Sequence, residues 1–195
     1  MELMSKSGIF YTPTLLVAYG GPWAENFYYE NTEVHDNPKI RHFMPHNILD
    51  DHTRRRPIWV RPDEQVFPRL AAQDTKIIKA GGKGCIGSHG QFQGLGYHWE
   101  MWSLAAGGMG NIEVLRSATI HGAEAMGLSQ DLGSLEAGKL ADLVVLNKNP
   151  LDDIHNTNTI RYVMKDGELF EGDTLNQVWP TEKKLPPLWW WDEKP

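Results

Sequence analysis

The sequence predicts a mixed α/β chain, and four stretches carry this prediction. Residues Ile9–Val17, IFYTPTLLV, are rich in β-branched and aromatic residues, which favour a strand. Apolar residues at nearly helical spacing predict a helix over Asp63–Ala80, and the apolar run Lys83–Ser88 follows it as a second short strand. Further along, the segment Asn111–Leu146 predicts a helix, two turns and then a short buried strand.

Local signals give the limits of the later elements. Asn111 is a suitable N-cap, and Gly127 can adopt the left-handed conformation that ends a helix, so one continuous helix is predicted between them. Another helix is predicted over Trp99–Ala106. In the segment Ile160–Phe170, the dipeptide Asp166-Gly167 favours a type I′ turn and predicts a β-hairpin.

Composition narrows the class of protein. The chain has 195 residues, of which 41% are hydrophobic and 23% charged, as is usual for globular proteins. A net charge of -6 argues against nucleic-acid binding. The single cysteine, Cys85, excludes an internal disulfide and leaves the redox compartment open. No apolar window is long enough for a transmembrane segment, and the Met1 end has no signal-peptide region.

A long polar and aromatic stretch follows Gly20-Gly21-Pro22 and extends to about Arg61. Loops of this length in compact domains are usually lids, binding loops or segments that hold short helices. The stretch contains four of the eight histidines, but their spacing matches no short metal-ligand motif such as HxH or HExxH. The sequence therefore predicts no metal site among them: His35, His42, His46 and His52.

Two segments resemble a known family. Residues 132–151, LGSLEAGKLADLVVLNKNPL, look like the tail motif of the amidohydrolase superfamily, and residues 87–102, GSHGQFQGLGYHWEMW, resemble its branch often fused to a TolB-like β-propeller. The resemblance implies the C-terminal portion of a (β/α)8 TIM-type barrel, with Ile9–Val17 as strand seven and Lys83–Ser88 as strand eight, plus strands of a small β-sandwich. The implied division is barrel over 1–130, sandwich strands over 131–172 and an aromatic, proline-rich tail over 173–195.

The resemblance also implies a site at the end of the second strand. Where most amidohydrolases have Ser-Asp or Thr-Asp, whose aspartate binds metal and acts as general base, this chain has Ser88-His89. An imidazole can ligate zinc and titrate near neutral pH, but it brings no negative charge. His89 is thus the expected catalytic residue and metal ligand, and His98 and Gln91 the expected substrate-binding residues. The alternatives are a loop histidine bonded to backbone for His89, and surface or packing roles for Glu100 and His121.

The implied reaction is metal-assisted hydrolysis of a C–N bond in an amide, cyclic amide or peptide-like small molecule, with zinc or another divalent metal in the full-length protein. The other metal ligands of the family would lie upstream of Met1. We therefore expect this chain to bind no zinc tightly, to be inactive by itself, and to need the N-terminal part of the same protein as its partner. The sequence leaves open whether the protein forms an oligomer. The resemblance to the propeller-fused branch implies that the full-length protein is periplasmic or extracellular.

Two other interpretations are open at this point. The chain could be a non-catalytic scaffold or interaction module that uses its long loop and its aromatic tail, which contains Trp189-Trp190-Trp191. It could also be a truncated coding frame. Three adjacent tryptophans bury a large area when they dock, so we expect them to pack against another surface of the full protein.

Overall fold

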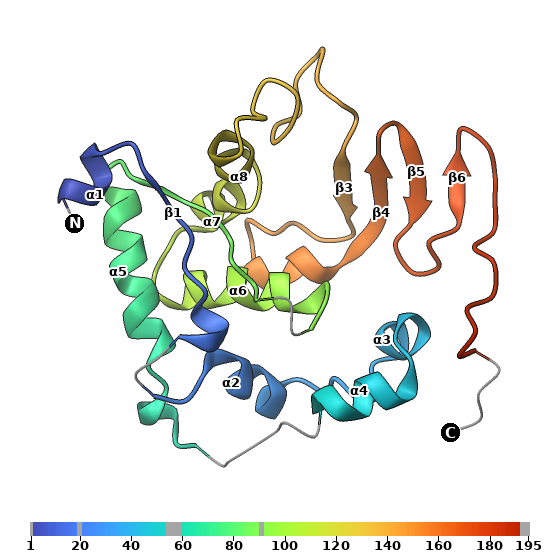
Figure 1. Ribbon diagram of the computed structural model, residues 1–195, viewed down its shortest axis with the longest axis horizontal. Helices are drawn as coiled ribbons and strands as arrows, with labels where there is room; N and C mark the ends of the chain where they lie inside the picture. Colours follow the sequence, from blue (N-terminus) through green and yellow to red (C-terminus); the bar gives the residue numbers. More distant parts are fainter. Residues whose placement is uncertain (1, 19–20, 54–59, 90–91, 192–195) are drawn as a thin grey trace.

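The computed structural model describes residues 2–18, 21–53, 60–89 and 92–191, and in this part no helix is long and apolar enough to cross a membrane. Figure 1 shows α1, α5 and β1 on the left of the molecule and the antiparallel sheet β3–β6 on the right. In chain order the elements are α1 (Glu2–Lys6), β1 (Phe10–Tyr11), α2 (Ala24–Asn31), α3 (Pro38–Phe43), α4 (His46–Thr53), α5 (Phe67–Lys79), β2 (Lys83–Gly84), α6 (Leu95–Ala106), α7 (Asn111–Ser117), α8 (Ile120–Ala125), β3 (Leu143–Leu146), β4 (Ile160–Lys165), β5 (Glu168–Glu171) and β6 (Gln177–Trp179).

Strands β1 and β2 pair in parallel and are joined through α5, which makes a βαβ unit. Both strands are shorter than the sequence predicts. Pro13 has no backbone N–H to donate, and the chain turns into a 3₁₀ helix at Leu15–Val17 instead of continuing as a strand. The backbones still approach closely beyond the ladder, because a Cβ built on Gly87 would lie 2.4 Å from the carbonyl oxygen of Pro13.

The core lies between α2, α5 and α6 and consists largely of aromatic rings. Trp99 of α6 is 1% exposed and stacks on Tyr28 of α2 with ring centroids 5.3 Å apart. Tyr29 meets the same indole edge-on at 5.2 Å. Because rings of this size bury more area than any other side chain, α2 anchors the start of the long segment that leads through α3 and α4.

The predicted single helix from Asn111 to Met126 is wrong, because α7 and α8 are separate. Thr119 lies between them with φ -134° and ψ -93°, and its hydroxyl donates to the Leu115 carbonyl oxygen at 2.7 Å in place of a continuing helical bond. Gly127 is left-handed at φ 73°, as predicted. The N-cap is Gly110; Asn111 is the first helical residue, and its side-chain amide donates to the carbonyl oxygens of Pro150 and Leu151.

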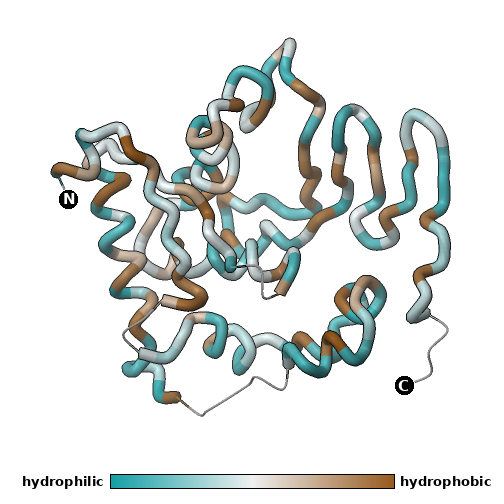
Figure 2. Tube along the Cα trace, in the orientation of Figure 1, coloured by the Kyte–Doolittle hydropathy of each residue, from teal (hydrophilic) through white to brown (hydrophobic). Residues whose placement is uncertain are grey.

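The C-terminal sheet is antiparallel in the order β3-β4-β5-β6. The predicted hairpin is confirmed, with Asp166 at φ 49° and Gly167 at φ 79° in the turn between β4 and β5. The prediction that the strand ending at Leu146 is buried is wrong, because Val144 and Val145 of β3 are 54% and 39% exposed. Figure 2 shows apolar residues along β3 and β4 at this outer part of the molecule. Strand β6 comes from the segment predicted to be a tail and joins the sheet edge.

Candidate functional site

The loop after β2 carries the first residue that the sequence singles out. His89 follows β2 by five residues, is exposed, and has a left-handed backbone with φ 58°. A left-handed conformation is uncommon for a residue with a Cβ and is typical of sharp turns and functional loops. Because His89 comes after β2 in the chain, it lies on the side of the βαβ unit where β2 ends. Barrel enzymes hold their active sites on this side. Gln91, the next predicted site residue, lies outside the described residues.

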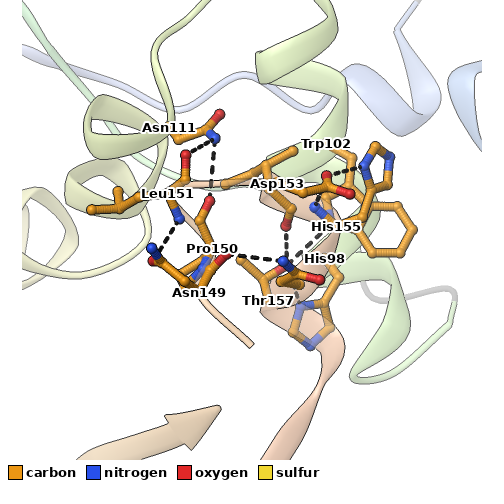
Figure 3. Close-up of polar contacts among 11 residues, drawn as sticks. His98, Trp102, Asn111, Asn149, Pro150, Leu151, Asp153, His155 and Thr157 are labelled. Carbon is orange, nitrogen blue, oxygen red and sulfur yellow. Dashed lines mark hydrogen bonds and ion pairs between the residues drawn. The ribbon is translucent and has the colours of Figure 1, made fainter. Parts of the chain in front are cut away.

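His98 lies on α6 and belongs to a network centred on Thr157. Its Nδ1 is 3.2 Å from the Thr157 hydroxyl oxygen, which also accepts from Trp102 Nε1 at 3.0 Å and donates to the Ile154 carbonyl oxygen at 2.9 Å (Figure 3). A threonine hydroxyl has one proton to donate, and here Ile154 receives it. His98 must therefore donate from Nδ1, and its Nε2 is left unprotonated.

The surroundings keep His98 neutral. Burial, helped by the positive charge of Lys39, lowers the pKa of His98 to about 4. His98 also lines a cavity of about 390 Å³ between α3 and the start of α6, together with Ile40, Phe92 and Asn158. An imidazole that is neutral at physiological pH, with a lone pair on Nε2, can accept a proton or a hydrogen bond from a small molecule. Among the described residues, no hydrogen bond or ring contact joins His98 to His89.

Glu100 is buried completely and has a structural role. Its two carboxylate oxygens accept hydrogen bonds from the backbone N–H groups of Leu15 at 2.8 Å and Leu16 at 3.1 Å. It is 0% exposed, which excludes the surface role that the sequence left open. Burial raises the pKa of Glu100 to about 8, while the two backbone bonds act in the opposite direction. Glu100 therefore fixes the segment after β1 against α6 and does not line the cavity beside His98.

Two further residues near β2 also have structural roles. His121 of α8 places its Nδ1 3.1 Å from the carbonyl oxygen of Gly84, which lies at the end of the parallel ladder. Cys85 is buried, and burial raises the pKa of its thiol, so it is held in the unreactive form. These contacts attach α8 to β2 and leave His89 as the residue exposed beyond the strand.

The long segment brings together three side chains that the sequence prediction left unconnected. Nε2 of His35 lies 2.9 Å from Oδ1 of Asp50, and Nε2 of His46 lies 3.7 Å from Oδ2 of the same carboxylate. One ligand atom from each residue falls within 4.8 Å of the others. The spacing of His46 and Asp50 could have predicted their proximity, because residues four apart on a helix lie on the same face. The approach of His35 depends on the turn of the chain through α3, which no motif encodes.

The aromatic tail docks within this chain. The indole N–H groups of Trp190 and Trp191 both donate to the carbonyl oxygen of His42, at 3.2 and 2.7 Å, and Trp191 stacks on the His42 ring with centroids 4.3 Å apart. The two indoles close one side of a cleft of about 670 Å³ whose other walls include Arg41 and His46. Only Trp189 of the three is largely exposed, at 66%.

Around His89 the described residues do not make a catalytic metal centre. Such a centre needs about three protein donors, and in the part of the chain that the structure describes His89 belongs to no group of three or more potential ligands. His89 can supply one donor or accept one proton, and no reaction step through a metal follows from this chain's own residues.

The fold and the site define a mixed α/β chain with a parallel βαβ unit and an attached antiparallel sheet, which matches part of a TIM-barrel hydrolase. Residues 76–170 match the model of the amidohydrolase family. A crystal structure of an Xaa-Pro dipeptidase with bound methionine in the active site superimposes with a TM-score of 0.57 and 28% identity, covering 88% of this chain and 36% of that one.

Two curated relatives match shorter segments. The imidazolonepropionase of Shouchella clausii is 43% identical over 67 residues, which are 32% of this chain and 15% of that protein. A 5-methylthioadenosine/S-adenosylhomocysteine deaminase of Teredinibacter turnerae is 45% identical over 71 residues, which are 35% of this chain and 15% of that protein. The matched segments thus span a small fraction of each curated relative, and the chain spans about a third of the solved dipeptidase.

Proposed function

We propose that this chain forms the C-terminal part of a metal-dependent amidohydrolase that cleaves C–N bonds in amide, cyclic amide or peptide-like small molecules. The observation that carries the proposal is the parallel β1–β2 pair followed by His89, with β2 and His89 inside the segment that matches the amidohydrolase family. In this proposal β1 and β2 are strands seven and eight of the barrel, and residues outside this chain supply the remaining strands and the other metal ligands.

His89 is the proposed catalytic residue. Its exposed position after β2 lets it face a substrate held over the end of the barrel, where it would hold a metal or transfer a proton. Removing a group that transfers protons in the transition state slows reactions by roughly 10²-fold or more. His98 is proposed to bind substrate, because its neutral Nε2 accepts hydrogen bonds and its ring lines a cavity. Gln91, close to His89 in sequence, is proposed to assist His98.

The substrate class rests on the names of the similar proteins. The dipeptidase and the deaminase named above both act on bonds between carbon and nitrogen. Their substrates differ widely, so we limit the proposal to the bond type. A parent from the branch with a TolB-like β-propeller is part of the same proposal, and it rests on the segment Gly87–Trp102 alone.

The test uses the chain together with the coding sequence that precedes it. We would measure metal-dependent hydrolysis of methionyl-proline, a simple lactam and an anilide, and compare His89→Ala, His98→Ala and the control His155→Ala. His155 is an exposed residue paired with Asp153; its ring contacts Trp102, but it does not line the cavity beside His98. We expect kcat to fall by roughly 10²-fold in His89→Ala, KM to rise mainly in His98→Ala, and neither to change in His155→Ala.

Unchanged kcat in His89→Ala, with the metal content intact, would remove His89 from the catalytic site. No chelator-sensitive hydrolysis of any of these substrates by the extended protein would contradict the proposed reaction class.

A further inference from the structure

The cluster of His35, His46 and Asp50 lies on the α3–α4 segment, and His89 is not one of its members. His35 precedes α3, whereas His46 and Asp50 lie four residues apart on α4 and therefore share one face of that helix. Nitrogen and carboxylate donors in this combination are those that zinc accepts in proteins. Among the described residues, this is the group in which three such side chains converge.

The separations between the donor atoms are close to those of a metal site. Zinc bonds of about 2.0–2.2 Å at tetrahedral angles put neighbouring ligand atoms roughly 3.4 Å apart. Nε2 of His35 lies 2.9 Å from Oδ1 of Asp50, Nε2 of His46 lies 3.7 Å from Oδ2, and one ligand atom from each of the three residues lies within 4.8 Å of the others. The His46 side chain is 47% exposed, so a change in its rotamer can supply the remaining adjustment without disturbing the core.

The groups around the cluster favour the orientation that a metal requires. While Nε2 of His35 faces Asp50, its Nδ1 lies 3.5 Å from Oδ1 of Asp36, and Arg41 approaches the same oxygen at 3.8 Å. Metal-binding histidines usually direct their second ring nitrogen at a carboxylate, which fixes the tautomer and raises the basicity of the ligating nitrogen. Asp36 occupies that position for His35.

The helices beside the cluster are short. Helix α3 has six residues, none of them buried, and α4 has eight residues, of which Leu49 and Thr53 are buried. Helices this short are not stable by themselves and depend on tertiary contacts. A metal bound between the residue before α3 and the face of α4 would close the loop between them and add to the support that the core and the docked tail give these helices.

We propose that His35, His46 and Asp50 bind one zinc-type divalent cation that clamps the segment before α3 against α4. His46 and Asp36 also line the cleft closed by Trp190 and Trp191, so the fourth coordination position faces a space that can hold water or a small ligand. This site differs from the one expected of the amidohydrolase resemblance. It would revise the expectation that the chain alone binds no zinc tightly.

The test titrates Zn²⁺ into the metal-stripped 195-residue chain by calorimetry and repeats the titration with Co²⁺ followed by visible absorption. We expect about one equivalent bound per chain, a tetrahedral Co²⁺ spectrum, and a melting temperature raised by roughly 5–10 °C at a hundredfold excess over Kd. His46→Ala, at a half-exposed position that should not affect folding, and Asp50→Asn should each weaken binding by at least tenfold, as loss of one of three ligands does.

Two control variants separate this site from its alternatives. His155→Ala removes a histidine that also pairs with an aspartate, Asp153 at 2.8 Å, but that has no third donor, and its Zn²⁺ affinity should equal that of the unmodified chain. His89→Ala should likewise retain the zinc. Binding that persists in His46→Ala, binding lost only in His89→Ala, or no stoichiometric binding at all would each overturn the proposal.

Discussion

The carboxylate of Glu100 accepts a hydrogen bond at 2.8 Å from the backbone N–H of Leu15, which lies 85 residues earlier in the chain. Its second oxygen accepts from Leu16 at 3.1 Å. These bonds satisfy two buried backbone groups at the point where β1 ends and no strand ladder is available. They connect the first strand of the βαβ unit to the helix that carries His98.

Replacing Glu100 by alanine should destabilise the chain strongly. Two buried N–H groups would lose their acceptors, at about 1–3 kcal/mol each, so we expect the free energy of unfolding to fall by about 3 kcal/mol or more. Urea denaturation would measure it. Glu30→Ala, on the exposed side of α2, is the matched control and should change the free energy by less than about 0.5 kcal/mol. Equal effects of the two variants would contradict the role of Glu100.

The raised pKa of Glu100 predicts a pH dependence of stability. The carboxyl group has a pKa of about 8 in the folded chain and an ordinary value of 4.5 when unfolded, so at intermediate pH the folded state binds more protons. The contribution of Glu100 to the free energy of unfolding is fully present below pH 4.5 and is lost as pH rises through 8. His98, whose folded pKa is lowered, acts in the opposite sense: its contribution is lost as pH falls from 6.5 to about 4.

The interval from pH 6.5 to 8 therefore isolates Glu100 from His98. We expect the free energy of unfolding to fall by roughly 1–2 kcal/mol across this interval, because one proton corresponds to about 1.4 kcal/mol per pH unit. Glu100→Gln cannot titrate and should show a smaller slope in chemical denaturation at each pH. A slope identical to that of the unmodified chain would show that another group carries the dependence.

Close packing of α5 against the end of α6 predicts contrasting effects at two glycines. A Cβ on Gly107 would lie 2.4 Å from backbone and side-chain atoms of Ala71, whereas a Cβ on Gly122 in α8 would meet nothing within 4 Å. Gly107→Ala should thus destabilise by about 1–3 kcal/mol through overpacking. Gly122→Ala should stabilise by up to about 1 kcal/mol through helix propensity. Thermal denaturation of both variants gives the comparison, and destabilisation of similar size in the two would argue against the α5–α6 contact.

The attachment of the tail can be tested by proteolysis. Trp191 donates to His42 and stacks on its ring, while Trp189 is largely exposed. Losing about 1 kcal/mol of local stability increases the open population roughly fivefold, so trypsin should cleave after Lys184 about fivefold faster in Trp191→Ala. Trp189→Ala should be cleaved at the rate of the unmodified chain. Equal rates in all three proteins would mean that the docked tail adds no protection.

The features that follow local rules were predictable. The Asp166-Gly167 hairpin is confirmed because two adjacent residues encode the turn, and Gly127 ends its helix because glycine tolerates φ 73°. The parallel order of the first two strands follows from a helix between two apolar runs. The shortness of the first strand was not predictable from local sequence. Pro13 has no backbone N–H to donate, and the N–H groups of Leu15 and Leu16 donate to Glu100, which lies far away in the sequence.

The helix break and the metal-type cluster show the limit of pattern reasoning. Thr119 fits the helical periodicity, but its hydroxyl takes the Leu115 carbonyl oxygen and separates α7 from α8. His35 joins His46 and Asp50 only because the chain folds back through α3, a tertiary effect that spacing does not reveal. The burial predicted for β3 failed for the same reason, since an apolar strand is buried only if another layer covers it.

The most direct test of the central claim compares hydrolysis of methionyl-proline by the 195-residue chain and by the same chain extended with its upstream coding sequence, both supplied with Zn²⁺. The account predicts turnover by the extended protein that a chelator abolishes, and none by the chain alone, because around His89 the described residues gather no three-donor group. Chelator-sensitive turnover by the chain alone, or none by the extended protein, would contradict it.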